Sequence, residues 1–156
     1  MEKTNNKTSF LKLFVRNRAA VIGLTLLIII ILLALLAPLI FPENPFKIVG
    51  KPLLEPFGEF VLGTDRLGRD VAAGVVHGAR TSILIASIAT FLSVILGTSI
   101  GSLSGYYGGQ VDNLLMRFTE FFQTIPSFVF AIVLVAILQP SIQSIVIAIT
   151  VVTWPP

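Results

Sequence analysis

The sequence predicts an all-α protein whose helices cross a membrane several times. Hydrophobic residues make up 54% of its 156 residues and charged residues only 12%, whereas about a quarter of the residues in soluble proteins are charged. The charges also gather in short stretches, which leaves three long uncharged intervals. This pattern is typical of a multi-pass transmembrane helix bundle, for which we expect about four spans.

The first uncharged interval supplies the first predicted span, residues 19–41. Its apolar part spans about 33 Å as a helix, which is enough to cross a hydrocarbon core. It is also longer than the apolar region of a signal peptide, about 7–15 residues, so we expect a retained span. Five basic residues and one acidic residue precede it. Because basic flanks stay in the cytoplasm, residues 1–18 are predicted to be a cytoplasmic tail.

Residues 42–80 are then predicted to be extracytoplasmic, as a proline- and glycine-rich linker followed by a short amphipathic helix at the membrane surface. Thr64 or Asp65 is expected to cap this helix. The alternative is an ordinary solvated helix with surface charge pairs. Two pairs lie at the i,i+4 spacing that stabilises helices: Asp65 with Arg69 and Arg66 with Asp70.

The remaining uncharged intervals predict three further spans. Proline removes a backbone donor and disfavours helix in the residue before it, so we expect a turn at Gln139-Pro140 and a kink or helix start at Pro126. The predicted elements are a span at 81–105, a cytoplasmic connection at 106–121, a span at 122–138 and a span at 141–156.

Small and polar residues carry the candidate functions within the spans. Gly97, Gly101 and Gly105 share one helix face and favour close helix packing, either within this subunit or between subunits. The predicted spans hold no charged residue, which argues against proton relays and ion-coupled sites. A substrate would pass along small and hydroxyl groups, although serines also bond to their own helices. The candidate serines are Ser82, Ser87, Ser93, Ser99 and Ser127.

The cytoplasmic connection is predicted to begin with a turn at Gly108 and Gly109. A helix follows in which Asp112 suits the positive end of the helix dipole, and Arg117 can pair with Glu120. Structural roles are favoured for these residues.

The residue types argue against an enzyme. The chain has no cysteine and a single histidine, His77, for which we expect an interfacial position. No nucleophile–base pair, metal-ligand cluster or phosphate-binding loop is found. We therefore predict no catalytic, cofactor or metal site, and the basic residues form no nucleic-acid patch.

Several short motifs together resemble a known family. The chain is similar to the C-type permease subunit of dipeptide, oligopeptide and nickel ABC importers, which are binding-protein-dependent inner-membrane components. The motifs that carry this resemblance run from Gly63 to Val71 (G-T-D-R-L-G-R-D-V), from Gly78 to Ser82 (G-A-R-T-S), from Gly105 to Asp112 (G-Y-Y-G-G-Q-V-D), Met116-Arg117 and from Ile125 to Ser127 (I-P-S).

The resemblance implies a set of partners and a location. Such a subunit lies in a prokaryotic inner membrane, contacts lipid, and pairs with a B-type permease. Two ATPase subunits drive transport, and an extracytoplasmic binding protein delivers the peptide. The family motif would then lie on the outer face, near the binding protein or the partner permease. Its residues are Gly63, Thr64, Asp65, Gly68, Arg69 and Asp70.

The resemblance also leads us to expect a truncated permease. Family members continue beyond the tryptophan-proline region into a cytoplasmic loop with an E-A-A-type signature, which docks on the ATPase, whereas this sequence stops at Pro156. Two other functions stay open: a nickel or glutathione importer permease, and a small membrane scaffold or assembly protein.

Overall fold

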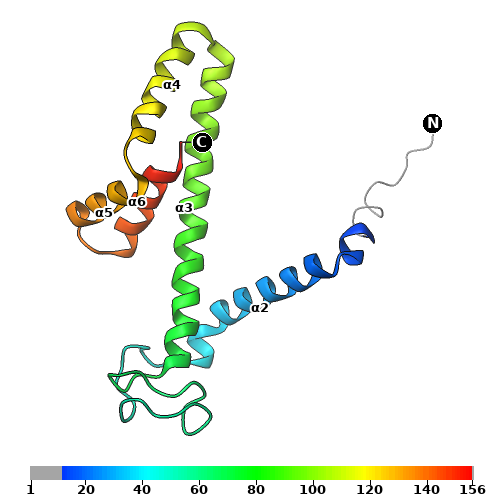
Figure 1. Ribbon diagram of the computed structural model, residues 1–156, viewed down its shortest axis with the longest axis vertical. Helices are drawn as coiled ribbons and strands as arrows, with labels where there is room; N and C mark the ends of the chain where they lie inside the picture. The colour runs from blue at the N-terminus through cyan, green and yellow to red at the C-terminus, as the bar shows by residue number, and fades with distance from the viewer. Residues whose placement is uncertain (1–11, 156) are drawn as a thin grey trace. The chain divides into compact units, whose positions relative to one another are not determined.

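The computed structural model describes residues 12–155, whose regular secondary structure is helical apart from isolated β-bridges. The helices in chain order are α2 (Arg18–Ile40), α3 (Val71–Tyr107), α4 (Gly109–Thr124), α5 (Ser127–Leu138) and α6 (Ile142–Thr153) (Figure 1). The predicted all-α membrane-protein class is confirmed. Residues 1–11 of the predicted basic tail and Pro156 at the end of the last predicted span lie outside the described residues.

The chain divides into two compact units, and the boundary between them along the chain falls within α3. The first ends at Thr81 and the second begins at Ser82. The first unit holds α2, the segment that follows it and the start of α3. The second holds the rest of α3 with α4, α5 and α6, and in it α5 and α6 pack against each other.

Helix α2 forms where the sequence is most apolar. Its N-cap is Asn17, whose side-chain oxygen accepts a hydrogen bond from the amide of Ala20 at 3.2 Å. The helix has 23 residues, about 35 Å, and is apolar enough to cross a bilayer. Most of its leucine and isoleucine side chains are exposed, as expected of a helix that faces lipid.

Helix α3 begins later than predicted. A helix start at Thr64 or Asp65 is wrong, because residues 64–70 form turns and isolated bridges instead. The cap is Asp70, whose Oδ1 accepts hydrogen bonds from the amides of Ala72 and Ala73 at 2.8 and 3.4 Å. From Val71 the helix continues for 37 residues, so the predicted surface helix and second span form one element.

Proline divides the last apolar interval into short helices. The sequence predicts a kink or helix start at Pro126, and α5 begins directly after it. Helices α4 and α5 are bent by 85° at this break. Pro140 separates α5 from α6, and these helices have 12 residues each. About four spans were expected. In residues 12–155 two helices can cross a membrane by length and composition, or three if α4 and α5 count as one bent span.

Candidate functional site

The family-like motif organises the segment between α2 and α3, residues 41–70, which we call the motif loop (Figure 1). Its backbone groups join distant parts of the loop. The carbonyl of Gly68 accepts a hydrogen bond from the amide of Val49 at 2.8 Å, and that of Asp65 accepts one from Leu53 at 3.1 Å. A loop without helix or strand satisfies its buried backbone groups in this way, so it has a defined fold.

Thr64 is a structural centre of the loop. The residue is buried, and its hydroxyl accepts a hydrogen bond from the amide of Leu54 at 2.9 Å and donates one to the carbonyl of Lys51 at 2.6 Å. One side chain thereby binds two backbone groups that lie ten and thirteen residues earlier in the chain. This role explains a threonine here better than helix capping does.

Gly63 and Gly68 occupy positions that other residues do not fit. Both have positive φ, +71° and +74°, a region that side chains with a Cβ rarely adopt. A Cβ on Gly63 would collide with the carbonyl oxygen of Leu54, and one on Gly68 with that of Gly50. The motif glycines therefore permit the close backbone crossings of the loop.

The two motif acids bind backbone amides and form no ion pair with another residue of 12–155. Oδ1 of Asp65 accepts hydrogen bonds from the amides of Leu67 and Arg69 at 2.8 and 2.9 Å, while Asp70 caps α3. The bond from the Arg69 amide, with further contributions from neighbouring amides and the Arg69 charge, lowers the pKa of Asp65. The stabilisation from this carboxylate is therefore present above its ordinary pKa and is lost as the pH falls through the lowered value.

The predicted pairs of Asp65 with Arg69 and of Arg66 with Asp70 are wrong. Within residues 12–155 the ion pair that forms is Lys47 with Glu43, at 2.8 Å on the surface. The guanidinium carbon of Arg69 lies 5.6 Å from the centre of the Phe46 ring, in a cation–π contact. Its Nε is buried without a hydrogen-bond partner among the described residues.

His77 fastens the start of α3 to the end of α2. Its Nε2 lies 2.9 Å from the carbonyl oxygen of Phe41 and donates to it. No group of three or more metal-ligating side chains occurs in the described part of the chain. The sequence gives His77 no visible partner because a backbone carbonyl 36 residues away leaves no signal in a pattern of side chains.

A groove between α3 and α6, about 750 Å³ in volume, is the candidate site in the second unit. Its walls carry small, apolar and hydroxyl side chains and no charged one. Inside it the hydroxyls of Ser93 and Thr153 lie 2.8 Å apart. The lining residues are Ser82, Ile85, Ala86, Ala89, Thr90, Ser93, Val94, Gly97, Thr98, Ile149, Thr153 and Trp154.

Two family models match this chain, one on each side of residues 57–92. Residues 8–56 match the N-terminal transmembrane domain of oligopeptide transport permease C, and residues 93–156 match the binding-protein-dependent transport system inner membrane component. The dipeptide transport system permease protein of Haemophilus influenzae is 38% identical over 149 residues, which cover 91% of this chain and 50% of that protein. The chain belongs to the C-type family of binding-protein-dependent transport permeases.

Other relatives give the same result. The di/tripeptide transport system permease protein of Pseudomonas aeruginosa is 36% identical over 94% of this chain and 50% of its own length. The oligopeptide transport system permease protein of Haemophilus influenzae is 38% identical over 90% of this chain and 46% of its own length. The C-type permease chain thus spans about half the length of the curated relatives it matches. The family is a transporter component of the inner membrane and not a catalytic enzyme.

The three spaced glycines of this permease chain differ in their surroundings. A Cβ on Gly97 would lie 3.0 Å from the carbonyl oxygen of Trp154, so α6 ends against this glycine. Gly101 and Gly105 have no atom of the described residues within 4 Å of such a Cβ, apart from their own helix. Of the predicted serines, Ser82 and Ser93 line the groove, whereas Ser87, Ser99 and Ser127 do not.

The predicted turn after α3 is present. Gly108 and Gly109 have positive φ, +59° and +54°, and reverse the chain between α3 and α4. The Ser104 hydroxyl donates a hydrogen bond to the carboxylate of Asp112, which links the end of α3 to the start of α4. Arg117 is exposed and makes no ion pair with Glu120 in the described chain, so that prediction is wrong.

Trp154 is a packing residue that the sequence did not reveal. It is buried, with 7% of its surface exposed, and its ring lies 6.0 Å from that of Phe118 and 5.6 Å from that of Phe122. These aromatic rings join α4 to the end of α6. The helical spacing of the phenylalanines was visible in the sequence, but their partner lies more than 30 residues further along.

Proposed function

We propose that this chain forms part of the membrane path of an ABC importer for dipeptides and oligopeptides. The names of its relatives, which are dipeptide, di/tripeptide and oligopeptide permeases, support this substrate class. Its N-terminus lies in the cytoplasm and the motif loop outside, as the basic residues before α2 indicate.

The groove between α3 and α6 is the observation that carries the proposal. Its volume of about 750 Å³ lies within the range of small-molecule sites, roughly 300–1,000 Å³. Hydroxyls such as those of Ser93 and Thr153 exchange hydrogen bonds with a passing peptide backbone. Because no charged side chain lines the groove, it offers no strong fixed charge to trap a peptide. Weak contacts at several points are what a conducting path requires.

The energy for transport comes from partner subunits in this proposal. The groove lacks the ionisable residues that ion-coupled transporters place within the membrane, and the sequence has no phosphate-binding loop. We therefore assign ATP hydrolysis to two ATPase subunits, the other half of the path to a B-type permease, and peptide delivery to an extracytoplasmic binding protein.

Purification of the tagged chain from membranes tests this assignment. The importer genes are expressed together, and we expect the second permease, the two ATPases and the binding protein to elute with the chain. The eluate, in vesicles of phosphatidylethanolamine and phosphatidylglycerol, should then take up a labelled dipeptide when ATP is supplied. Co-elution of an unrelated membrane protein in place of these partners would favour the scaffold function. Uptake of nickel but not of the dipeptide would show that the substrate is nickel and not a peptide.

The proposed orientation is tested by Glu55→Cys. Glu55 is exposed in the motif loop, and the chain has no cysteine of its own, so the new thiol is the single target in this protein. We expect an impermeant maleimide to label it in intact cells. A matched cysteine at Arg117, which is also exposed, should react after the cells are opened. The reverse pattern would invert the topology.

A further inference from the structure

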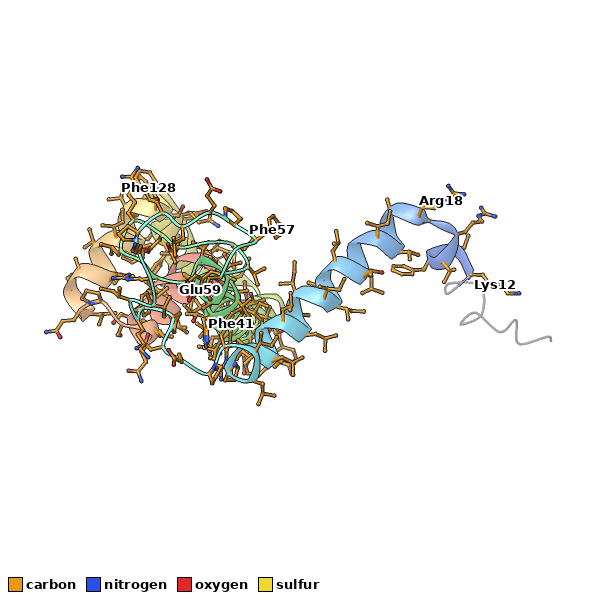
Figure 2. All side chains as sticks on the ribbon, turned by 90° about the horizontal axis from the view of Figure 1, so that it is seen from below. Lys12, Arg18, Phe41, Phe57, Glu59 and Phe128 are labelled. Atoms are coloured by element: carbon orange, nitrogen blue, oxygen red, sulfur yellow. The ribbon has the colours of Figure 1, made fainter. Side chains whose placement is uncertain are left out.

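The motif loop presents one aromatic side chain almost completely to its surroundings. Phe57 is 86% exposed, and no large hydrophobic residue in the described chain is more exposed. Figure 2 shows it at the outer edge of the loop. Glu55 and Glu59, two residues before and after it, are exposed as well, and neither forms an ion pair within residues 12–155. This part of the loop therefore exposes one apolar side chain between two carboxylates. We call residues 55–59 the Glu55–Glu59 turn.

The backbone fixes this exposure. Phe57 follows Pro56 and has a φ of +63°, which is unfavourable for a bulky residue. Its amide donates a hydrogen bond to the carbonyl of Val61 at 3.2 Å. Three residues later Phe60 lies half-buried, with its ring against Gly50. Such strain persists only where the surrounding structure imposes it, and it recurs at functional positions. The loop thus holds Phe57 outward while Phe60 anchors the turn.

The charges of the turn favour a protein over the lipid surface as the partner. Segments that bind membranes carry lysine and arginine near their apolar side chains, because lipid headgroups are often anionic. Here the nearest charged residues in the chain on either side of Phe57, Glu55 and Glu59, are acidic, and an anionic surface repels them. An aromatic side chain surrounded by a polar, solvent-accessible rim is instead a composition found at protein–protein interfaces.

We propose that the Glu55–Glu59 turn is a docking point for the extracytoplasmic binding protein. The complementary surface on that protein is an apolar pocket that receives the Phe57 ring and is bordered by lysine or arginine. One aromatic ring between two solvated carboxylates is a small contact, as suits a partner that binds and leaves, and the rim charges speed the encounter. This inference rests on the proposed function, because that function supplies the partner.

Photo-crosslinking and affinity measurements test the docking point. The photoreactive residue p-benzoyl-L-phenylalanine replaces Phe57 in the purified importer, and the purified binding protein is added before illumination. We expect adducts with the binding protein. In the unlabelled importer, Phe57→Gly should weaken binding about tenfold or more, as loss of a hot-spot side chain does. Glycine suits the positive φ at this position, so the loop should keep its fold and the importer its thermal stability.

Leu53→Gly is the matched control. Leu53 is 69% exposed, also follows a proline and also has a positive φ, +56°, but it lies between Lys51 and Glu55 at the same spacing. Its replacement should change the affinity less than about twofold, whereas Glu55→Lys with Glu59→Lys should slow association markedly. Two results would overturn the inference if the importer subunits still co-purify. One is adducts with lipid alone or with the second permease, and the other is an unchanged affinity of Phe57→Gly for the binding protein. Failure of those subunits to co-purify would overturn the proposed function as well.

Discussion

Gly68→Ala is expected to open the motif loop and to expose it to proteases. Gly68 is buried, has a φ of +74°, and lies so close to the carbonyl of Gly50 that an added methyl group would collide with it. Its own carbonyl accepts hydrogen bonds from the amides of both Val49 and Gly50. The substitution therefore combines backbone strain with the loss of these bonds. We expect a cost of about 3 kcal/mol to the folding of the loop.

Trypsin provides the measurement because Arg66 and Arg69 lie inside the loop. When opening is fast relative to cleavage, the cleavage rate follows the population of the open form. A cost of about 3 kcal/mol corresponds to cleavage on the order of 100-fold faster in the detergent-solubilised protein. Gly58→Ala is the matched control, since the nearest atom to its added Cβ is the Glu55 carbonyl oxygen at 3.7 Å, an ordinary contact. Equal cleavage rates for the two variants would contradict the role of Gly68.

The motif loop shows what local sequence signals can and cannot predict. The motif from Gly63 to Val71 was recognisable, and so was the presence of a helix after it. The start of the helix was misplaced because Thr64, Asp65 and Asp70 are all good capping residues. The choice among them depends on Gly63 and Gly68, whose positive φ keeps residues 63–68 out of a helix. The i,i+4 ion pairs depended on the same misplaced helix.

The spans were largely predictable from the sequence, whereas the groove was not. Helix α2 was predictable because no proline or charge interrupts its core, although it contains Pro38 near its end. The breaks at Pro126 and Pro140 were also predictable, but the 85° bend between α4 and α5 was not, since a proline weakens a helix without setting the new direction. The groove joins Ser93 to Thr153 across 60 residues. The sequence predicted that small and hydroxyl side chains would line such a path. Only the tertiary structure shows that two of the five candidate serines, Ser82 and Ser93, line the groove.

Leucine at Gly97 and leucine at Gly101 should have different effects, although the two glycines share a helix face. At Gly97 the added side chain would press on the carbonyl of Trp154, 3.0 Å from the position of its Cβ. Overpacking of this kind costs about 1–3 kcal/mol. The end of α6 should move away from α3, which exposes the indole ring. Trp154 is the single tryptophan of the chain, so its fluorescence reports this change directly.

We expect Gly97→Leu to shift the Trp154 emission to longer wavelength and to lower the thermal transition of the purified chain. Gly101→Leu places its side chain where the described residues leave open space, so both properties should stay unchanged. A small residue on an apolar helix that has no packing partner among the described residues suits contact with another subunit. Gly101→Leu should therefore reduce co-purification of the second permease. Identical Trp154 emission and stability in Gly97→Leu would show that α6 does not pack here, and full assembly of Gly101→Leu would confine the packing role to Gly97.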